Sequence, residues 1–166
     1  IVTGDFDGQF GDDIAVTLES TNQIAVLLRQ ANGAYGAPTL IGVGMVPFSI
    51  VAADFDGTNG IDLAVANEQD GTVLILENNG SGVFTAQQNS ITVEDFPLEI
   101  VVADVDGANG PDLVVVNDQN NSFQLLLNDG MGELSAQVPI GTGVSPTSVA
   151  VADFDVDGDQ DIAVTT

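Results

Sequence analysis

The chain has 166 residues, of which 44% are hydrophobic, so it is long enough for one domain and apolar enough to build a core. Its net charge is −24, with 25 acidic residues against one arginine, which excludes direct binding to nucleic acid or to anionic membranes because phosphates could not be neutralised. Cysteine, histidine and tryptophan are absent, which excludes disulfides and imidazole or thiolate metal sites, and no apolar run approaches the roughly 20 residues of a membrane span.

The first predicted element is a short apolar strand that ends at an aspartate-rich loop, Asp5 to Asp13. A second strand begins at Asp13, and a third apolar run follows at residues 24–28. After an Asn-Gly turn at residues 32–33, a weaker extended segment leads to Pro47. These short segments are rich in β-branched residues and separated by turn residues, which predicts four antiparallel strands, A to D, with the aspartate loop joining A to B.

The same order of elements returns along the rest of the chain. Further loops of nine residues run from Asp54 to Asp62, from Asp104 to Asp112 and from Asp153 to Asp161, at spacings of 49, 50 and 49 residues. Four short strands in such a period are typical of a β-propeller blade, and we prefer this fold to a β-sandwich or a solenoid. The predicted blades cover residues 1–44, 45–94 and 95–143, and a half blade covers residues 144–166.

Three blades and strands A and B of a fourth are fewer than the four to eight that usually close a propeller. An open array would leave an apolar face and an unpaired strand edge at each end. We therefore expect other protein chains, or further blades of the same protein, to cover these ends. Since the chain starts at Ile1, we expect it to be a processed form or a fragment of a longer chain.

The loops themselves predict cation sites, because they contain 15 of the 19 aspartates. Clustered carboxylates repel one another unless a cation lies among them, and oxygen ligands on a flexible loop favour Ca²⁺ over Mg²⁺. We number each loop from 1 to 9 and expect ligands at positions 1, 3, 5, 7 and 9, with a backbone carbonyl at position 7 of each loop and at Ala108. The candidate ligands for up to four Ca²⁺ ions are Asp5, Asp7, Gln9, Gly11 and Asp13; Asp54, Asp56, Thr58, Gly60 and Asp62; Asp104, Asp106, Ala108, Gly110 and Asp112; and Asp153, Asp155, Asp157, Asp159 and Asp161.

The loops differ from an EF-hand, which begins in a similar way. An EF-hand requires a glutamate at position 12 and flanking helices, whereas position 12 is a valine within a predicted strand in all four loops. Aspartate-rich surface turns without an ion remain the alternative, disfavoured because four loops recur in register. At position 6, Gly158, Asn59 and Asn109 suit a left-handed turn, and Phe10 is not expected to do so.

Two segments resemble a known repeat. Pro47 to Asn67 (PFSIVAADFDGTNGIDLAVAN) and Val73 to Phe84 (VLILENNGSGVF) look like an FG-GAP/VCBS repeat, the unit of the integrin-α-type β-propeller. The resemblance implies Ca²⁺ bound on the outer rim by the loop between strands A and B, with positions 1, 3 and 9 matching in every loop and position 5 matching only at Asp157. It also implies an extracellular or cell-surface setting, with a role in adhesion or surface assembly.

We therefore expect a non-enzymatic, calcium-binding extracellular module for adhesion, surface structure or protein–protein interaction. The usual general bases and nucleophiles, histidine, lysine and cysteine, are absent, and the aspartates are already accounted for by the loops. The alternatives are a scaffold domain of a secreted carbohydrate-active or phosphodiester-cleaving enzyme, and a lectin. Glycan binding stays open as a partner, although aromatic platforms are scarce, and the sequons at Asn79 and Asn120 leave glycosylation open.

Overall fold

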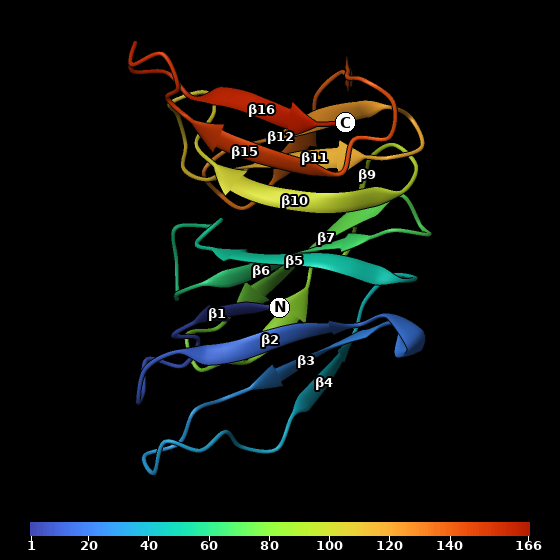
Figure 1. The fold of residues 1–166 in the computed structure, drawn as a ribbon. Helices are drawn as coiled ribbons and strands as arrows, with labels where there is room; N and C mark the ends of the chain where they lie inside the picture. The colour runs from blue at the N-terminus through green and yellow to red at the C-terminus, as the bar shows by residue number, and fades with distance from the viewer.

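The computed structural model describes residues 1–166, which form sixteen β-strands and one short 3-10 helix, η1 (Glu19–Thr21). No helix in it has the length and apolar character needed to cross a membrane. The strands form four separate sheets in chain order (Figure 1). The first sheet contains β1 (Val2–Gly4), β2 (Asp13–Leu18), β3 (Gln23–Leu27) and β4 (Thr39–Gly42).

The second and third sheets are built alike. The second contains β5 (Pro47–Ala53), β6 (Asp62–Asn67), β7 (Thr72–Asn78), β8 (Phe84–Ala86) and β9 (Ile91–Thr92). The third contains β10 (Pro97–Ala103), β11 (Asp112–Asn117), β12 (Ser122–Asn128), β13 (Leu134–Ala136) and β14 (Ile140–Gly141). The last sheet is the pair β15 (Ser148–Ala152) and β16 (Asp161–Thr165).

Each complete sheet is an antiparallel meander in which neighbours in sequence are neighbours in space. The fourth strand is interrupted in the second and third sheets: β8 and β9 both pair with β7, at its two ends, and β13 and β14 pair with β12 in the same way. The expected blades of four antiparallel strands, three complete and one reduced to strands A and B, are therefore confirmed, while the interruption of strand D was not predicted. We call the sheets blades 1, 2 and 3 and the half blade.

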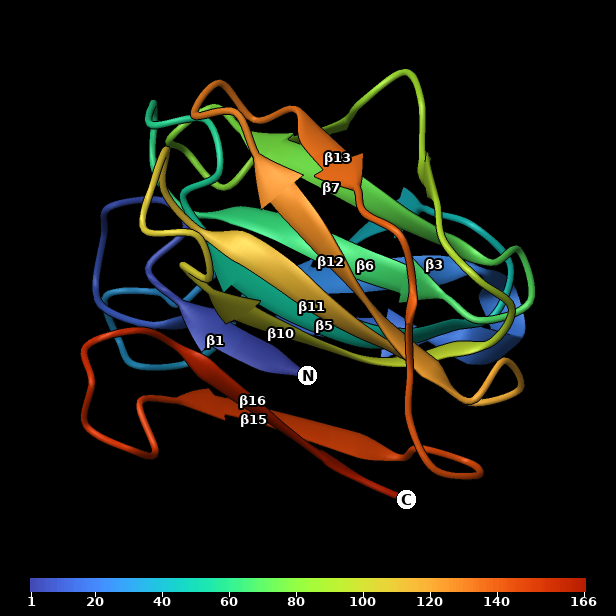
Figure 2. The same cartoon turned by 90° about the horizontal axis from the view of Figure 1, so that it is seen from above.

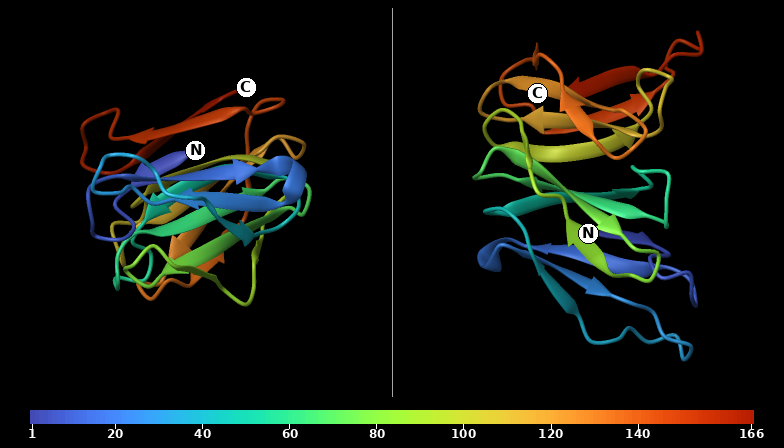
Figure 3. Two further views of the ribbon diagram at one scale, coloured as in Figure 1. Left: turned by 90° about the horizontal axis from the view of Figure 1, so that it is seen from below. Right: turned by 180° about the vertical axis from the view of Figure 1, so that it is seen from behind.

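The blades stack in chain order, with blade 1 and the half blade at opposite ends of the stack (Figures 1 and 3). Their first strands lie next to one another, since β5 contacts β10, and β10 contacts β15. Viewed from above, the four loops between strands A and B lie on the same side of the molecule (Figure 2). The stacking therefore aligns all four aspartate loops at one end of the blades.

The core lies between blades rather than within one. One apolar cluster lies between blades 1 and 2 and contains Phe6, Leu63 and Leu76, and another lies between blades 2 and 3 and contains Phe55 and Leu113. All six residues of β6 and all six of β11 are buried. A third, smaller cluster with Val114, Val116 and Val149 lies between blade 3 and the half blade. Strands β6 and β11 are thus covered on both faces, and each of the three interfaces stabilises the fold through buried apolar area.

Candidate metal sites in the loops between strands A and B

In every loop, the structure brings together the carboxylates of positions 1, 3 and 9. Within each group, one oxygen from each side chain lies within 4.8 Å of the others. The four groups are Asp5, Asp7 and Asp13; Asp54, Asp56 and Asp62; Asp104, Asp106 and Asp112; and Asp153, Asp155 and Asp161. In the fourth loop, the carboxylates at positions 5 and 7, Asp157 and Asp159, are not part of the group, and in the other loops these positions carry no carboxylate.

The aspartate at position 9 is the first residue of strand B, and backbone hydrogen bonds fix its orientation. In the second loop, Asp62 Oδ2 accepts a hydrogen bond from Phe55 N–H (3.0 Å) and Oδ1 accepts one from Asn78 N–H (2.8 Å). Asp112 makes the same pair of bonds, to Val105 N–H and Asn128 N–H. Each of these carboxylates is fully buried and ties the start of its loop to the end of strand C, a structural role that was not predicted from the sequence.

The aspartate at position 3 organises the tip of its loop. Asp7, Asp56 and Asp106 each accept a hydrogen bond through Oδ1 from the N–H of the residue two positions later, at 2.7–2.9 Å. Such Asx turns hold a tight bend without an ion. They leave Oδ2 of each side chain available to a cation, and in Asp7 and Asp106 a second lone pair on Oδ1 as well.

The aspartate at position 1 accepts at most one hydrogen bond in the first three loops, whereas Asp153 in the fourth accepts one from Asp157 N–H and one from Gly158 N–H. Asp54 is exposed and no hydrogen bond ends on its side chain, and the same holds for Asp104, whereas Asp5 Oδ1 accepts one from Gly8 N–H. Asp54 and Asp104 nevertheless lie beside two other carboxylates. Without a cation, this placement is repulsive, since like charges at this distance oppose one another.

The backbone of the first three loops shares left-handed residues at positions 4, 6 and 7. At position 6, Phe10 has φ = 63°, close to Asn59 (60°) and Asn109 (62°). The expectation that Phe10 would not adopt this turn is therefore wrong: glycines at positions 4 and 7, Gly8 and Gly11 in this loop, bend the chain on both sides of it. The glycines at position 4 are visible in the sequence as Asp-x-Asp-Gly, and this signal could have predicted the shared turn.

The fourth loop is built differently. Its left-handed residues are Val156 (φ = 65°) at position 4 and Gly158 (φ = 101°) at position 6. Asp157, the extra carboxylate at position 5, accepts a hydrogen bond from Asp159 N–H (3.0 Å) through Oδ1. It lies outside the group formed by positions 1, 3 and 9, and so does Asp159.

Among the other predicted ligands, Thr58 Oγ1 donates a hydrogen bond to Asp56 Oδ1 (2.9 Å), which brings it next to the carboxylate group of the second loop. Gln9 and Ala108 take part through their backbone N–H groups, described above. The glycines at position 7 of the first three loops, Gly11, Gly60 and Gly110, have φ of 91°, 114° and 100°.

In the second loop, the pKa of Asp62 is shifted by burial and by the neighbouring carboxylates. Burial raises the pKa of Asp62, which the backbone hydrogen bonds from Asn78 and Phe55 counteract, and the charges of Asp56 and Asp54 raise it further. Its ionised form is thus disfavoured where three carboxylates meet. A divalent cation would remove this penalty.

The residues present fit Ca²⁺. Oxygen ligands lie 2.3–2.6 Å from Ca²⁺, so oxygens on opposite sides of one ion are about 5 Å apart, and the three carboxylates of each loop fall within one such sphere. The donor set is oxygen alone, as a hard cation requires. Each loop could therefore hold one ion through its first, third and ninth residues, with water or backbone carbonyls completing the coordination.

Two asparagines that were not predicted from the sequence connect the first and second loops to the next blade. Asn78, at the end of strand C of blade 2, donates from Nδ2 to Phe6 O (2.9 Å) in the first loop and to Ile61 O (3.0 Å). Asn128 of blade 3 donates in the same way to Phe55 O in the second loop. Both are 3% exposed, so these bonds are shielded from water, and they fix the position of each loop relative to the following blade. A sequence signal existed: each precedes a glycine turn by the same interval.

The fold and its loops define a set of β-propeller blades with an aspartate cluster in each. Residues 54–109 and 104–164 each match the family model of the FG-GAP-like repeat, and together they include more than half of the chain. The chain therefore belongs to the FG-GAP-like repeat family. No curated protein matches it in sequence.

Two solved structures share its fold, both crystal structures of BBS1N in complex with ARL6DN. The first, soaked with mercury, is 15% identical with a TM-score of 0.64, and the alignment covers 98% of this chain and 49% of that one. The second, soaked with lead, is 16% identical with a TM-score of 0.52, and the alignment covers 91% of this chain and 57% of that one. The chain thus spans about half the length of these propellers, and at such low identity the likeness shows the fold alone.

Proposed function

We propose that this chain is a non-enzymatic, extracellular, calcium-binding module that serves adhesion, surface assembly or protein–protein interaction. The observation that carries the proposal is the meeting of three carboxylates in each of four loops aligned at one end of the blades. Bound Ca²⁺ would neutralise each group and stiffen the loop, while binding of a partner would use other surfaces.

The expected strength of these sites supports an extracellular setting. Each has three carboxylates on an exposed loop, so we expect weak affinity, and weak sites stay filled at the millimolar calcium found outside cells. A protein partner is supported by the BBS1N structures, in which a propeller of the same fold is in complex with another protein. The lack of histidine, lysine and cysteine supports a non-catalytic role.

Calcium binding and its structural effect can be tested together with Asp54→Asn and Asp104→Asn. These carboxylates contribute to the groups but make no other hydrogen bond, so their only expected partner is the ion. We expect isothermal titration calorimetry to show up to four sites in the parent chain and two fewer in the double variant. In calcium, the melting temperature of the double variant should fall below that of the parent. In chelator, it should equal or slightly exceed the parent value, because two repulsive charges are gone.

Asp95→Asn is the matched control, because Asp95 is a carboxylate outside the loops. It should leave both the number of sites and the calcium-dependent melting shift unchanged. If the parent chain binds no calcium, or if chelator does not lower its melting temperature, the proposed role of the loops is wrong. If the double variant is destabilised equally in calcium and in chelator, these aspartates act as structural turn residues rather than ligands.

A further inference from the structure

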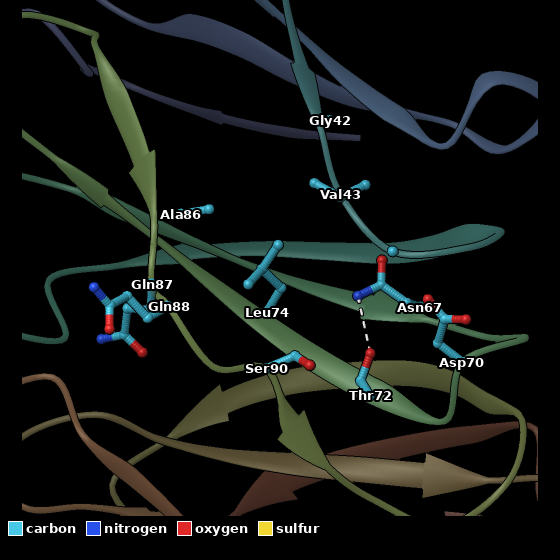
Figure 4. Close-up of a pocket in the computed structure, with 11 residues that line it drawn as sticks. Gly42, Val43, Asn67, Asp70, Thr72, Leu74, Ala86, Gln87, Gln88 and Ser90 are labelled. Atoms are coloured by element: carbon cyan, nitrogen blue, oxygen red, sulfur yellow. Dashed lines mark hydrogen bonds between the residues drawn. The ribbon is translucent and has the colours of Figure 1, made fainter.

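Blade 2 carries a groove that wraps around its outer edge. A hollow of about 530 Å³ lies against blade 1 and is lined by Gly44, Asn67, Asp70 and Thr72, among others (Figure 4). It shares residues 86–88 with a second hollow of about 410 Å³, which Glu133 of blade 3 also lines. The second shares Glu77 and Thr85 with a third, of about 180 Å³, that ends at the second aspartate loop. The three hollows therefore adjoin one another around β8 and the segment after it. We call them the blade 2 groove.

A buried acceptor without a donor lines the first hollow. Asn67 is 1% exposed; its Nδ2 donates to Thr72 Oγ1 (3.2 Å), and its Oδ1 has no hydrogen-bond partner. A buried carbonyl oxygen without a donor is costly, so a ligand that brings an N–H group here is favoured. Figure 4 shows Asn67, Thr72 and Asp70 together at one side of the hollow.

The asparagine side chain at this position is open to a hollow at the junction of blades 1 and 2 but not at the junction of blades 2 and 3. Asn117 holds the same position in blade 3 and is also buried without partners. At that junction, however, the residue that corresponds to Gly44 is Glu94, which accepts a hydrogen bond from Ser122 Oγ. None of the hollows in the structure is lined by Asn117. Gly44 thus keeps the blade 1–2 junction open where Glu94 closes the other.

The negative charge of the groove favours a positively charged ligand. Carboxylates lie along its whole course: Asp70 in the first hollow, Glu77 and Glu133 in the second, and Asp56 in the third. No basic side chain lines it, and the chain has only Arg29, which lies elsewhere. The other polar lining is mostly amide and hydroxyl groups. The groove therefore combines negative charge with side chains that can also accept hydrogen bonds, and a cationic group that only donates is complementary to both.

We propose that the blade 2 groove binds an extended, basic segment of a partner protein, with one lysine or arginine side chain in the first hollow beside Asn67 and Asp70. This inference rests on the proposed function, since it gives the interaction module a recognition surface and a partner chemistry. It uses the outer edge of the blade and needs no metal ion for recognition. Calcium acts only at the third hollow, where Asp56 belongs to both the groove and a loop.

The test is fluorescence anisotropy with the full chain in millimolar calcium and a labelled octapeptide that alternates arginine and serine. We expect saturable binding that weakens with added salt. The variant is the triple change Asp70→Asn, Glu77→Gln and Glu133→Gln, which keeps an acceptor atom at each position: Asp70 Oδ2 accepts from Met45 N–H and Glu77 Oε1 from Gln87 Nε2. Loss of three charge contacts at this edge should weaken binding about tenfold.

The control removes the same charge from residues that do not line the groove, with Glu19→Gln, Glu99→Gln and Asp118→Asn; glutamine at residue 99 keeps an acceptor for Val149 N–H. If both triple variants weaken the peptide equally, the binding is general attraction to an acidic chain and the proposed groove is wrong. Absence of peptide binding, or equal binding of a glutamate–serine octapeptide, also overturns it. Displacement of the peptide by a neutral oligosaccharide, tested with maltotetraose, would assign the groove to sugars instead. Calcium binding is measured on the same samples by calorimetry. If calcium binds but the peptide does not, the groove proposal alone is wrong; if calcium does not bind either, the proposed function is wrong as well.

Discussion

The second and fourth loops carry the same aspartates at positions 1, 3 and 9, yet they sit in different surroundings. Asp62 is fully buried and both of its oxygens accept backbone hydrogen bonds, one from the loop and one from strand C. Asp161 keeps only the bond within its loop, from Phe154 N–H, and is half-buried, because the half blade has no strand C. The comparison teaches that the burial of this carboxylate comes from strand C and not from the loop.

The aromatic residue at position 2 shows the same dependence on a neighbour. Phe55 is 1% exposed between blades 2 and 3, whereas Phe154, at the same loop position, is 57% exposed beyond the half blade. Phe6 resembles Phe55: it is 1% exposed and meets Phe84 of the next blade edge to face, with ring centroids 5.5 Å apart. This residue is therefore a contact to the next blade, carried on a loop that also forms a candidate metal site.

The largest expected effect comes from removing this contact. Phe55→Ala should lower the free energy of unfolding by about 4 kcal/mol, because it leaves a cavity in the largest apolar cluster. Phe154→Ala should change it by less than about 0.5 kcal/mol, since the ring is mostly in solvent. Urea unfolding followed by circular dichroism measures both. Similar losses in the two variants would show that Phe154 is covered in solution, for example by a second copy of the chain.

The buried carboxylate comes next. In chelator, Asp62→Ala should cost about 3 kcal/mol, because two buried N–H groups lose their acceptor. Asp161→Ala should cost about 1 kcal/mol, since one exposed bond is lost. Urea unfolding in chelator isolates this role from metal binding. Equal costs would mean that the hydrogen bond from strand C contributes nothing.

A smaller effect is expected from the left-handed position 4. Val156 has φ = 65°, a region that β-branched residues avoid, whereas Gly57 occupies it in the second loop with φ = 69°. Val156→Gly should therefore stabilise the chain by about 1 kcal/mol, and Gly57→Val should destabilise it by a similar amount. Opposite shifts in melting temperature support this, and shifts of the same sign contradict it.

The smallest effect concerns pH. Since burial raises the folded-state pKa of Asp62, the stability associated with its protonated form is present below the unfolded pKa and is lost as pH rises through the folded value. In chelator, the melting temperature should fall as pH rises from acidic values towards 7, and Asp62→Asn should reduce this slope. Phe154→Ala removes no titratable group, serves as the comparison and should leave the slope unchanged. In calcium, the parent trend should weaken or reverse, because the ion favours the ionised carboxylate.

Much of the fold could be predicted from local patterns. Short β-branched segments, turn glycines and a repeat of about 50 residues predict the blades. Each blade is a meander of strands that are adjacent in sequence, so local patterns are sufficient to identify it. The meeting of positions 1, 3 and 9 also follows from a loop that starts and ends on adjacent antiparallel strands. The turn at Phe10 was misjudged because flanking glycines, rather than the residue's own preference, set its backbone conformation.

The sequence by itself therefore determined the repeating blades, the family resemblance and the four groups of aspartates. Only the tertiary structure decided that Asp62 also anchors strand C and that Asn78 and Asn128 join the first two loops to the next blade. It also decided that Gly44 leaves a groove open at one blade junction, whereas Glu94 closes the other. The physical reason is that these roles depend on contacts between strands or blades brought together by folding. The repeat pattern in the sequence does not predict such contacts, because they form only when the sheets have stacked.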